Sequence, residues 1–394
     1  NLFLHTSFPS ISKNFLLFVA SLLVFFIVFE IVGRTFIKLP NPYPITNGAL
    51  IFDQRGFWLH QPSINDKFDN RVDFRNESVK TYSSGLRQLP CRLNTGSMHP
   101  RIFIIGDSQT FGWGLSDKNT WANKLQCSLN KNKMLFNVIN MGVSATNLDQ
   151  YVTRIRMFFN GLTSKDIVIF NITWNDYHSF QKIKKKIDPR VQCKKVTEVS
   201  KKAYYPQFCP THKPIFTGKD NTWRRTLYLN TGIFFPVFSS FKNFLTTINF
   251  SSISAHLAIP LLRGIYVRFR EDNTLTLIKP NTFRSNNILI EQVHSLLKTK
   301  TKNILFTFLP SRISYIDELY QLYSKNGTVF PDQDFLWHYV KNTCDKNSLS
   351  CLSLFKSLKT KNIGTYDFIH DGHLNNEGST RVSNTIFKYL KDNI

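Results

Sequence analysis

Several signatures that would identify a protein class are missing from this sequence. None of the 6 cysteines stands in a C-x-x-C pair or in a Cys/His zinc spacing, so we expect no metal site. There is no internal repeat. Acidic residues are also scarce, because 26 Asp and Glu stand against 50 Lys and Arg, which gives a formal net charge of +24.

The positive charge has one dense cluster, at Lys182–Lys195. An excess of this kind attracts nucleic acid, anionic lipid or acidic glycans, but it does not select a fold. No nucleic-acid-binding motif lies beside the cluster. We therefore interpret it as a solvated face and expect no nucleic acid partner.

The composition is that of a folded protein with a large core. Hydrophobic residues make up 42% and aromatic residues 14% of the 394 residues, which excludes a disordered chain. That length allows one large or two ordinary domains. Cysteines that lie close in sequence form two convenient pairs, Cys193/Cys209 and Cys344/Cys351, which leaves Cys91 and Cys127. The sequence does not choose among the possible pairings, and we expect disulfides only if the chain is exported.

The amino-terminal region predicts export. The run Phe15–Phe29 has no charged residue, and the apolar character continues past Glu30 to Gly33. This is close to the roughly 20 residues that span a bilayer, and Arg34–Lys38 follows in place of a small-residue cleavage site. We predict an uncleaved transmembrane helix that makes this a single-pass membrane protein, with the remainder periplasmic or extracellular. The flanking charges, Lys13 among them, do not fix the orientation.

The rest of the chain divides into three parts by pattern. After the tail and anchor at 1–38, residues 39–100 form a proline-rich linker and an irregular lead-in with short strands. Residues 101–394 form one domain, in which an insertion at about 181–283 interrupts an alternation of strands and helices. We expect strands at Arg101–Gly106, Phe136–Asn140, Asp166–Ile172 and Asn303–Leu309, and helices at Thr120–Asn130, Leu148–Asn160, Asn287–Lys298, Tyr315–Ser324, Asp334–Lys341 and Ser379–Lys391.

A possible nucleophile follows the first of these strands. Gly106-Asp107-Ser108 turns the chain at the carboxyl end of the strand, which is where open α/β folds keep their active sites. A serine hydroxyl needs a neighbouring base to become reactive. Asp371-Gly-His373, near the other end of the chain, offers a carboxylate and an imidazole.

Candidate oxyanion donors follow all three early strands. They are the backbone N–H of Ser108, the backbone N–H of Ala145 after the second strand, and the side-chain amide of Asn175 after the third. Such donors stabilise the negative charge that develops on a carbonyl oxygen during acyl transfer.

Gly106-Asp107-Ser108 is followed in order by Thr110, Gly112 and Gly114, the block Asn175-Asp176 and the Asp371/His373 pair. In these residues the chain resembles the SGNH (GDSL-like) hydrolase superfamily. The lead-in Tyr82–Arg87 looks like that of its membrane-anchored bacterial members. The resemblance implies a three-layer α/β/α sandwich with a mostly parallel, flavodoxin-like sheet. It also implies hydrolysis or transfer of an ester, without a metal or organic cofactor.

The resemblance also implies roles for single residues. Ser108 is the nucleophile, His373 the general base and Asp371 the acid that orients the imidazole. Asp367 and His370 form an alternative pair, because they match the family's usual Asp-x-x-His spacing. We favour His373, because the residues after it match the family's usual continuation into its last helix.

Two positions depart from the family's pattern. Ala145 stands where an oxyanion glycine is usual, and Trp174 stands where the asparagine block often has glycine. Asp107 is expected to anchor the turn, and Trp113 and Trp121 to pack in the core.

The predicted function is a serine esterase that acts on an acyl ester, such as an O-acetyl or other O-acyl group of a carbohydrate or lipid. One alternative is an O-acyltransferase with the same triad. The other is a non-catalytic glycan-binding protein that keeps the fold.

Overall fold

The structure is a computed structural model of the whole chain. It describes residues 50–52, 58–70, 72–93, 99–144, 146, 148–177, 280–324, 333–369 and 371–394, with scattered positions between 15 and 28. Most of the predicted anchor and most of the predicted insertion, with its basic cluster, lie outside the described residues.

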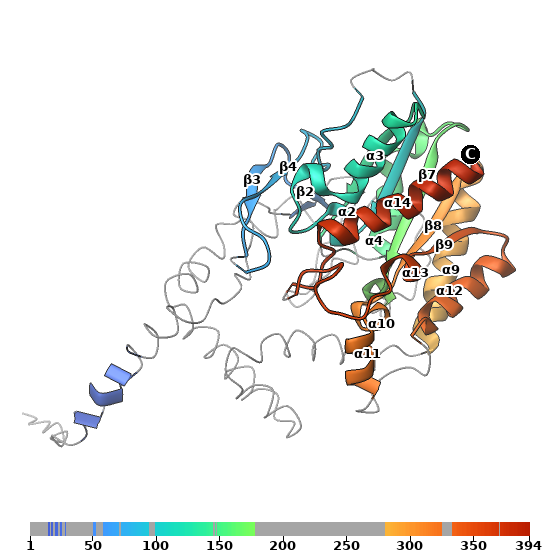
Figure 1. Cartoon of the computed structure of the whole chain (residues 1–394). Coiled ribbons are helices and arrows are strands. Elements are labelled where there is room, and N and C mark those ends of the chain that lie inside the picture. Colours follow the sequence, from blue (N-terminus) through green and yellow to red (C-terminus); the bar gives the residue numbers. More distant parts are fainter. Residues whose placement is uncertain are drawn as a thin grey trace, which may run out of the picture.

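Five parallel strands form the central sheet (Figure 1). Its strands are β5 (Arg101–Gly106), β6 (Asn137–Gly142), β7 (Ile167–Thr173), β8 (Ile304–Leu309) and β9 (Ser350–Ser353). The spatial order is β6-β5-β7-β8-β9, and every neighbouring pair is parallel. The direction of the crossovers therefore reverses between β5 and β7, and ligands of open α/β sheets bind at such a point.

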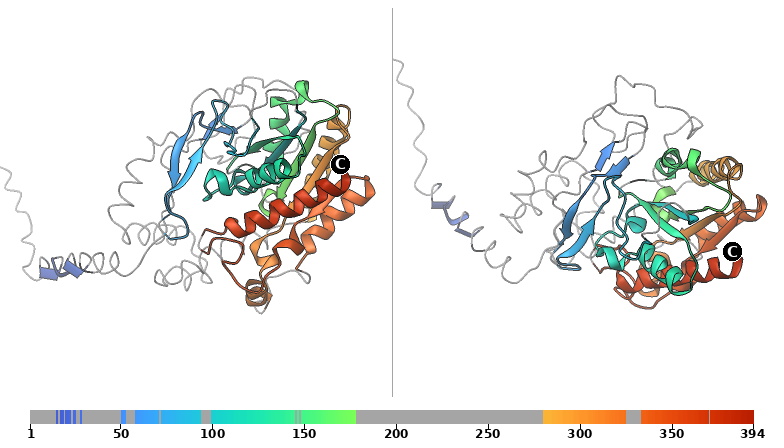
Figure 2. Two further views of the ribbon diagram at one scale, coloured as in Figure 1. Left: turned by 45° about the horizontal axis from the view of Figure 1, so that its top comes forward. Right: turned by 90° about the horizontal axis from the view of Figure 1, so that it is seen from above.

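Helices cover both faces of the sheet (Figure 2). On one face α3 (Trp121–Lys131) packs against α14 (Asn376–Asn393), and on the other α4 (Leu148–Arg154) packs against α9 (Pro280–Leu297). Further helices between residues 99 and 394, within the described residues, are α2 (Ser108–Phe111), α10 (Arg312–Tyr315), α11 (Asp317–Ser324), α12 (Phe335–Lys346) and α13 (Phe355–Leu358). Single 3-10 turns lie at Asp117–Asn119 (η1), Ile155–Met157 (η2), Phe159–Gly161 (η3) and Trp174–Tyr177 (η4).

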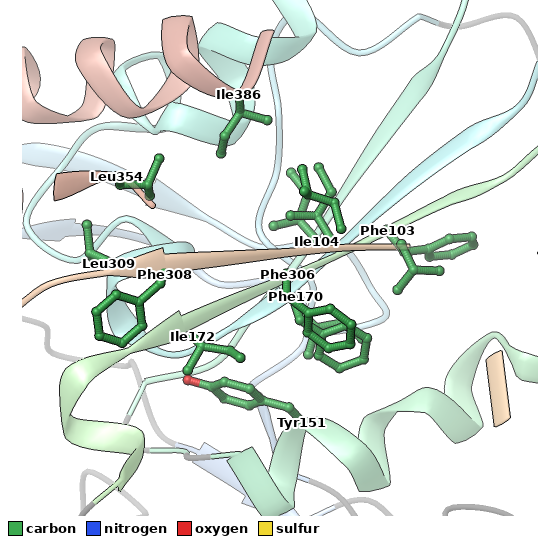
Figure 3. Close-up of a cluster of buried hydrophobic side chains, with 14 of the residues drawn as sticks. Phe103, Ile104, Tyr151, Phe170, Ile172, Phe306, Phe308, Leu309, Leu354 and Ile386 are labelled. Carbon is green, nitrogen blue, oxygen red and sulfur yellow. The ribbon is translucent and has the colours of Figure 1, made fainter. Parts of the chain in front are cut away.

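Buried side chains on the two faces of the sheet hold the layers together. Figure 3 shows Ile386 of α14 on one side of the sheet and Tyr151 of α4 on the other, with the rings of Phe170 and Phe306 side by side on the face toward Tyr151. The two phenylalanine rings stack with centroids 5.4 Å apart. All residues of β7 and β8 are buried, as expected of central parallel strands covered on both faces.

The lead-in packs beside α2 as two hairpins. Strand β1 (Leu50–Phe52) pairs with β2 (Trp58–His60), and β3 (Asn65–Phe68) pairs with β4 (Glu77–Lys80), both antiparallel. Ile64, Phe68, Phe74 and Val79 form a small second core with Phe111 of α2. A disulfide between Cys91 and Cys127 of α3 links this region to the domain, and a second joins Cys344 and Cys351.

The predicted strands and helices are confirmed, with shifted ends. The prediction of a helix over Leu148–Asn160 is too long, because α4 ends at Arg154 and single 3-10 turns follow. The expected sheet lacked β9, which is a short strand of partly exposed residues. Among the described residues, no helix combines the length and the apolar character needed to cross a bilayer.

Candidate active site

Ser108 lies where β5 ends, as the first residue of α2. The side chain of Asp107 caps this short helix by accepting the N–H of Gln109 at 2.9 Å, so the prediction that Asp107 anchors the turn is confirmed. Gly142 lets α2 lie against the end of β6, since a Cβ atom there would be 2.2 Å from the backbone nitrogen of Phe111. The Ser108 N–H makes no hydrogen bond within α2, because the first N–H groups of a helix have no acceptor inside it.

The structure brings His373 and Asp371 to this serine. His373 Nε2 lies 2.7 Å from Ser108 Oγ, and His373 Nδ1 is hydrogen-bonded to Asp371 Oδ1. The contact between Ser108 and His373 joins positions 265 residues apart in sequence. The arrangement is that of a nucleophile, a base and an orienting acid in line.

A tight turn between α13 and α14 carries both Asp371 and His373. Phe368 N–H donates to the His373 carbonyl at 2.8 Å, and Gly372 takes a left-handed conformation with φ of 85°. Asn375 then caps α14 by accepting the N–H groups of Glu377 and Gly378. The start of α14 therefore fixes the place of the histidine.

The electrostatics favour an ionised Asp371. Burial alone would raise its pKa, but the charge of His373 and hydrogen bonds from His373 outweigh burial, so the pKa of Asp371 lies below its usual value. The side chains of His373 and Asp371 are 23% and 19% exposed, so the pair is accessible from solvent. A carboxylate at Nδ1 stabilises the imidazolium that forms when Nε2 takes a proton.

The alternative pair is arranged differently. Asp367 forms a buried ion pair with Arg312 and accepts the N–H of Gly364 at 2.9 Å. His370 lies outside the described residues. The carboxylate of Asp367 therefore serves Arg312, and the contact with His373 is made by Asp371.

A buried polar network joins Asp107, the neighbour of Ser108, to residues of β7, η4 and α4. Thr173 Oγ1 lies 2.9 Å from Asp107 Oδ2 and 3.1 Å from Asp176 Oδ2, and Tyr151 donates to Asp176 Oδ1 at 2.8 Å. Burial and the nearby Asp107 raise the pKa of Asp176 well above its usual value. The contact of Asp107 with Thr173 ties the end of β5 to the end of β7, and Tyr151 ties α4 to η4. Tyr151 stands in no motif, so no sequence signal could have indicated it.

The remaining residues that the sequence singled out are Ala145, Asn175, Trp113 and Trp121. Ala145 lies outside the described residues; the backbone of Asn175 lies in η4, but its side chain is not described. Trp121 is buried in the core and donates its indole N–H to the Gln109 carbonyl at 3.2 Å. Trp113 packs on Phe68, with ring centroids 5.1 Å apart, and its ring centroid lies 6.1 Å from that of His373.

A small cleft of about 120 Å³ opens beside Ser108 and His373. Its other walls include the apolar side chains of Leu309, Pro310 and Trp174, which stand at the ends of β7 and β8. Within the described part of the chain, no group of three or more potential ligands could hold a metal ion. The cleft thus places an apolar wall next to a serine that has a base within hydrogen-bond distance.

No protein-family model matches the sequence, and no curated protein matches it. Among solved structures, the chain is similar to a lipolytic protein of the G-D-S-L family from Veillonella parvula, with 11% identity and a TM-score of 0.37 over 74% of this chain and 98% of that chain. It is also similar to the acetyl xylan esterase AlAXEase, with 13% identity and a TM-score of 0.37 over 74% and 99% of the two chains. A third is a lipase/acylhydrolase from Enterococcus faecalis, with 11% identity and a TM-score of 0.38 over 74% and 96%. Because these TM-scores lie below 0.5, the function is inferred from the geometry of the site and not from these likenesses.

Proposed function

We propose that this chain is an SGNH-type serine hydrolase that cleaves an acyl ester. The observation that carries the proposal is the contact of Ser108 Oγ with His373 Nε2 at 2.7 Å, with Asp371 on the other ring nitrogen. The serine is placed at the point of the sheet where the crossovers reverse, and an open cleft lies beside it.

The reaction proceeds in two acyl-transfer steps. Ser108 Oγ attacks the ester carbonyl carbon while His373 Nε2 takes the hydroxyl proton, and the carbonyl electrons move to oxygen to give a tetrahedral oxyanion. The carbon–alkoxy bond breaks as His373 gives its proton to the departing alcohol, which leaves an acyl-serine. Water then attacks the acyl-serine with His373 again as base, and an acid is released with Ser108 restored.

The oxyanion needs hydrogen-bond donors aimed at it. The N–H of Ser108 lies at the start of α2 and is suited to this role. We propose the N–H of Ala145 and the side-chain amide of Asn175 as its companions, since they come after the two strands on either side of β5.

The size of the cleft supports a short acyl group, and we propose that this group is carried on a carbohydrate or lipid hydroxyl. A cavity of about 150 Å³ holds a benzene molecule, and this cleft has about 120 Å³, with one apolar wall at Leu309, Pro310 and Trp174. An acetyl to butyryl group occupies less space than benzene or about the same.

We further propose that the domain works outside the cytoplasm, held to a membrane by its amino-terminal helix. The support is that the four described cysteines form two disulfides, which persist in oxidising compartments. The sequence pattern at Phe15–Phe29 supports the anchor.

A fluorophosphonate probe tests the proposal directly, because it reacts with activated serines. We expect labelling of the wild type and hydrolysis of p-nitrophenyl acetate, with both lost in Ser108→Ala and labelling strongly reduced in His373→Ala. Ser128→Ala, on helix α3, is the matched control and should behave as wild type.

A folded wild type that neither reacts with the probe nor hydrolyses the ester would contradict the proposal and favour a non-catalytic binding protein. Labelling together with transfer of the acyl group to an added sugar hydroxyl, faster than to water, would show a transferase instead.

A further inference from the structure

The turn that carries the acid and the base is held from the lead-in. The backbone N–H of Asp371 donates to Asp73 Oδ2 at 2.9 Å, across 298 residues of sequence. Asp371 precedes Gly372, whose left-handed backbone makes the turn tight. Gly372 has no side chain that could pack against neighbouring residues and hold the turn in place. The direction of the Asp371 peptide is therefore set by a residue from another part of the chain.

Asp73 is itself held in place by a built loop. Asn70 is buried, and its Oδ1 accepts the N–H groups of Val72, Asp73 and Phe74 at 3.2, 2.9 and 3.1 Å. The side-chain amide of Asn70 also donates to Asp73 Oδ2 at 3.2 Å. Asp73 Oδ2, which accepts the Asp371 N–H, is thus also oriented by the hydrogen bond from the Asn70 amide.

Aromatic packing brings the same two segments together. The rings of Phe74 and Phe368 lie 5.0 Å apart by centroid, and Phe368 stands three residues before Asp371. Gly114 makes room for this pair, because a Cβ atom at its φ of 77° would lie 2.6 Å from Phe74 and 2.8 Å from Phe368. The loop Asn70–Phe74 and the turn Asp367–Leu374 are therefore in contact at both a polar and an apolar point.

We propose that Asp73 is a positioning residue for the catalytic acid, and that the lead-in is a working part of the active site. The inference rests on the proposed function. Asp73 fixes the peptide of Asp371, whose carboxylate holds His373 in the tautomer and orientation that point Nε2 at Ser108.

The test compares Asp73→Ala with Asp73→Asn. In the Ala variant the turn loses its tether, so we expect kcat for p-nitrophenyl acetate to fall about tenfold or more with little change in KM, and the rate of fluorophosphonate labelling to fall with it. The Asn variant keeps an oxygen at the same place, so its kcat should stay within about threefold of wild type. Asp66→Ala is the matched control, because the nearby Asp66 accepts the N–H of its own neighbour Lys67.

Circular dichroism and thermal melting verify that each variant is folded. If the Ala variant does not fold, Asp73→Glu replaces it, because the longer side chain displaces the oxygen and should lower kcat about as much. Wild-type kcat in a folded Ala or Glu variant, or an Asn variant as slow as Ala, would overturn the positioning role. Failure of the wild type itself to label or hydrolyse would instead overturn the proposed function.

Discussion

At the scale of single residues, Asp367 and Asp371 differ in what faces their carboxylates. Asp367 is buried against Arg312, whose side chain is 2% exposed. Asp371 is partly exposed and bonded to His373. The carboxylate of Asp367 therefore stabilises the fold, and the carboxylate of Asp371 is part of the candidate active site.

Substituting each of these aspartates by asparagine should separate the two roles. Asp371→Asn should lower kcat by about 10⁴ with little change in stability, because the amide no longer stabilises the imidazolium in its working tautomer. Asp367→Asn should lower the free energy of unfolding by about 3–5 kcal/mol, because it leaves a buried guanidinium without its carboxylate. Urea denaturation and ester hydrolysis measure the two effects, and the reverse assignment of losses would show that Asp367 is the catalytic acid.

His60 is a buried histidine with a structural contact. It stacks on Phe111 at 3.8 Å, and its Nε2 accepts the N–H of Ser144 at 3.2 Å, in the loop after β6. Burial, with the charges of Arg87 and Arg154, lowers the pKa of His60 to about 3. The imidazole is therefore neutral in the folded state.

This pKa predicts a pH dependence of stability. Below a pH of about 6.5 the unfolded chain binds a proton at His60, whereas the folded chain does not bind it until the pH nears 3. The free energy of unfolding therefore decreases as the pH falls from about 6.5 toward 3. The slope from this group is about 1.4 kcal/mol per pH unit. In His60→Gln, whose amide oxygen still accepts an N–H, the free energy of unfolding between pH 6 and 4 should fall less steeply by about that amount. Equal slopes in urea denaturation at several pH values would refute it.

At the scale of elements, the approach of α2 to β6 decides where Ser108 stands. Gly142→Ala places a Cβ atom 2.2 Å from Phe111 N, so α2 must move. We expect a loss of stability of about 1–3 kcal/mol and a fall in kcat of at least about tenfold as Ser108 shifts from His373.

Gly161→Ala serves as the control for this substitution, because a Cβ atom at Gly161 meets nothing within 4 Å. Wild-type hydrolysis by Gly142→Ala would show that the spacing of α2 and β6 does not set the position of the serine.

The elements that could be predicted are those with a continuous apolar signal. Strands β5, β7 and β8 are apolar runs buried on both faces, and the sequence predicts each of them to within one residue at either end. Strand β9, Ser350–Ser353, has two serines among four residues, and only its pairing with β8 makes it a strand. The start of α9 at Pro280 was missed because the apolar repeat begins later.

The site divides in the same way. Ser108 and the Asp371/His373 pair stand in short local patterns, so the sequence predicted them, and the structure places them together. Folding alone brings Asp73 and Tyr151 near the site, and no pattern in the sequence around them distinguishes these two residues from others. Neither residue stands in a motif, whether its contact spans 298 residues, as for Asp73, or 25 residues, as for Tyr151.

At the scale of the whole molecule, two disulfides close loops of different length. Cys91 and Cys127 are 36 residues apart and join the lead-in to α3, while Cys344 and Cys351 are 7 apart. Cross-linking removes more entropy from an unfolded chain when the loop is longer.

Replacing both cysteines of each disulfide by serine should therefore have unequal effects. Loss of the Cys91–Cys127 disulfide should lower the free energy of unfolding by roughly 4 kcal/mol, and loss of Cys344–Cys351 by roughly 2 kcal/mol. Urea denaturation of the two double variants gives the values. A larger loss from the shorter loop would contradict the entropic explanation.

The distance in sequence between Ser108 and its base also sets an order in time. A ribosome adds about 5–20 residues per second, so His373 is synthesised roughly 13–53 s after the serine from which it is separated by 265 residues. Throughout that interval Ser108 lacks the imidazole of His373, however well the first strands have folded. On the proposed function, a growing chain thus cannot attack esters it meets during synthesis, and its reactivity begins only when α14 docks beside α3.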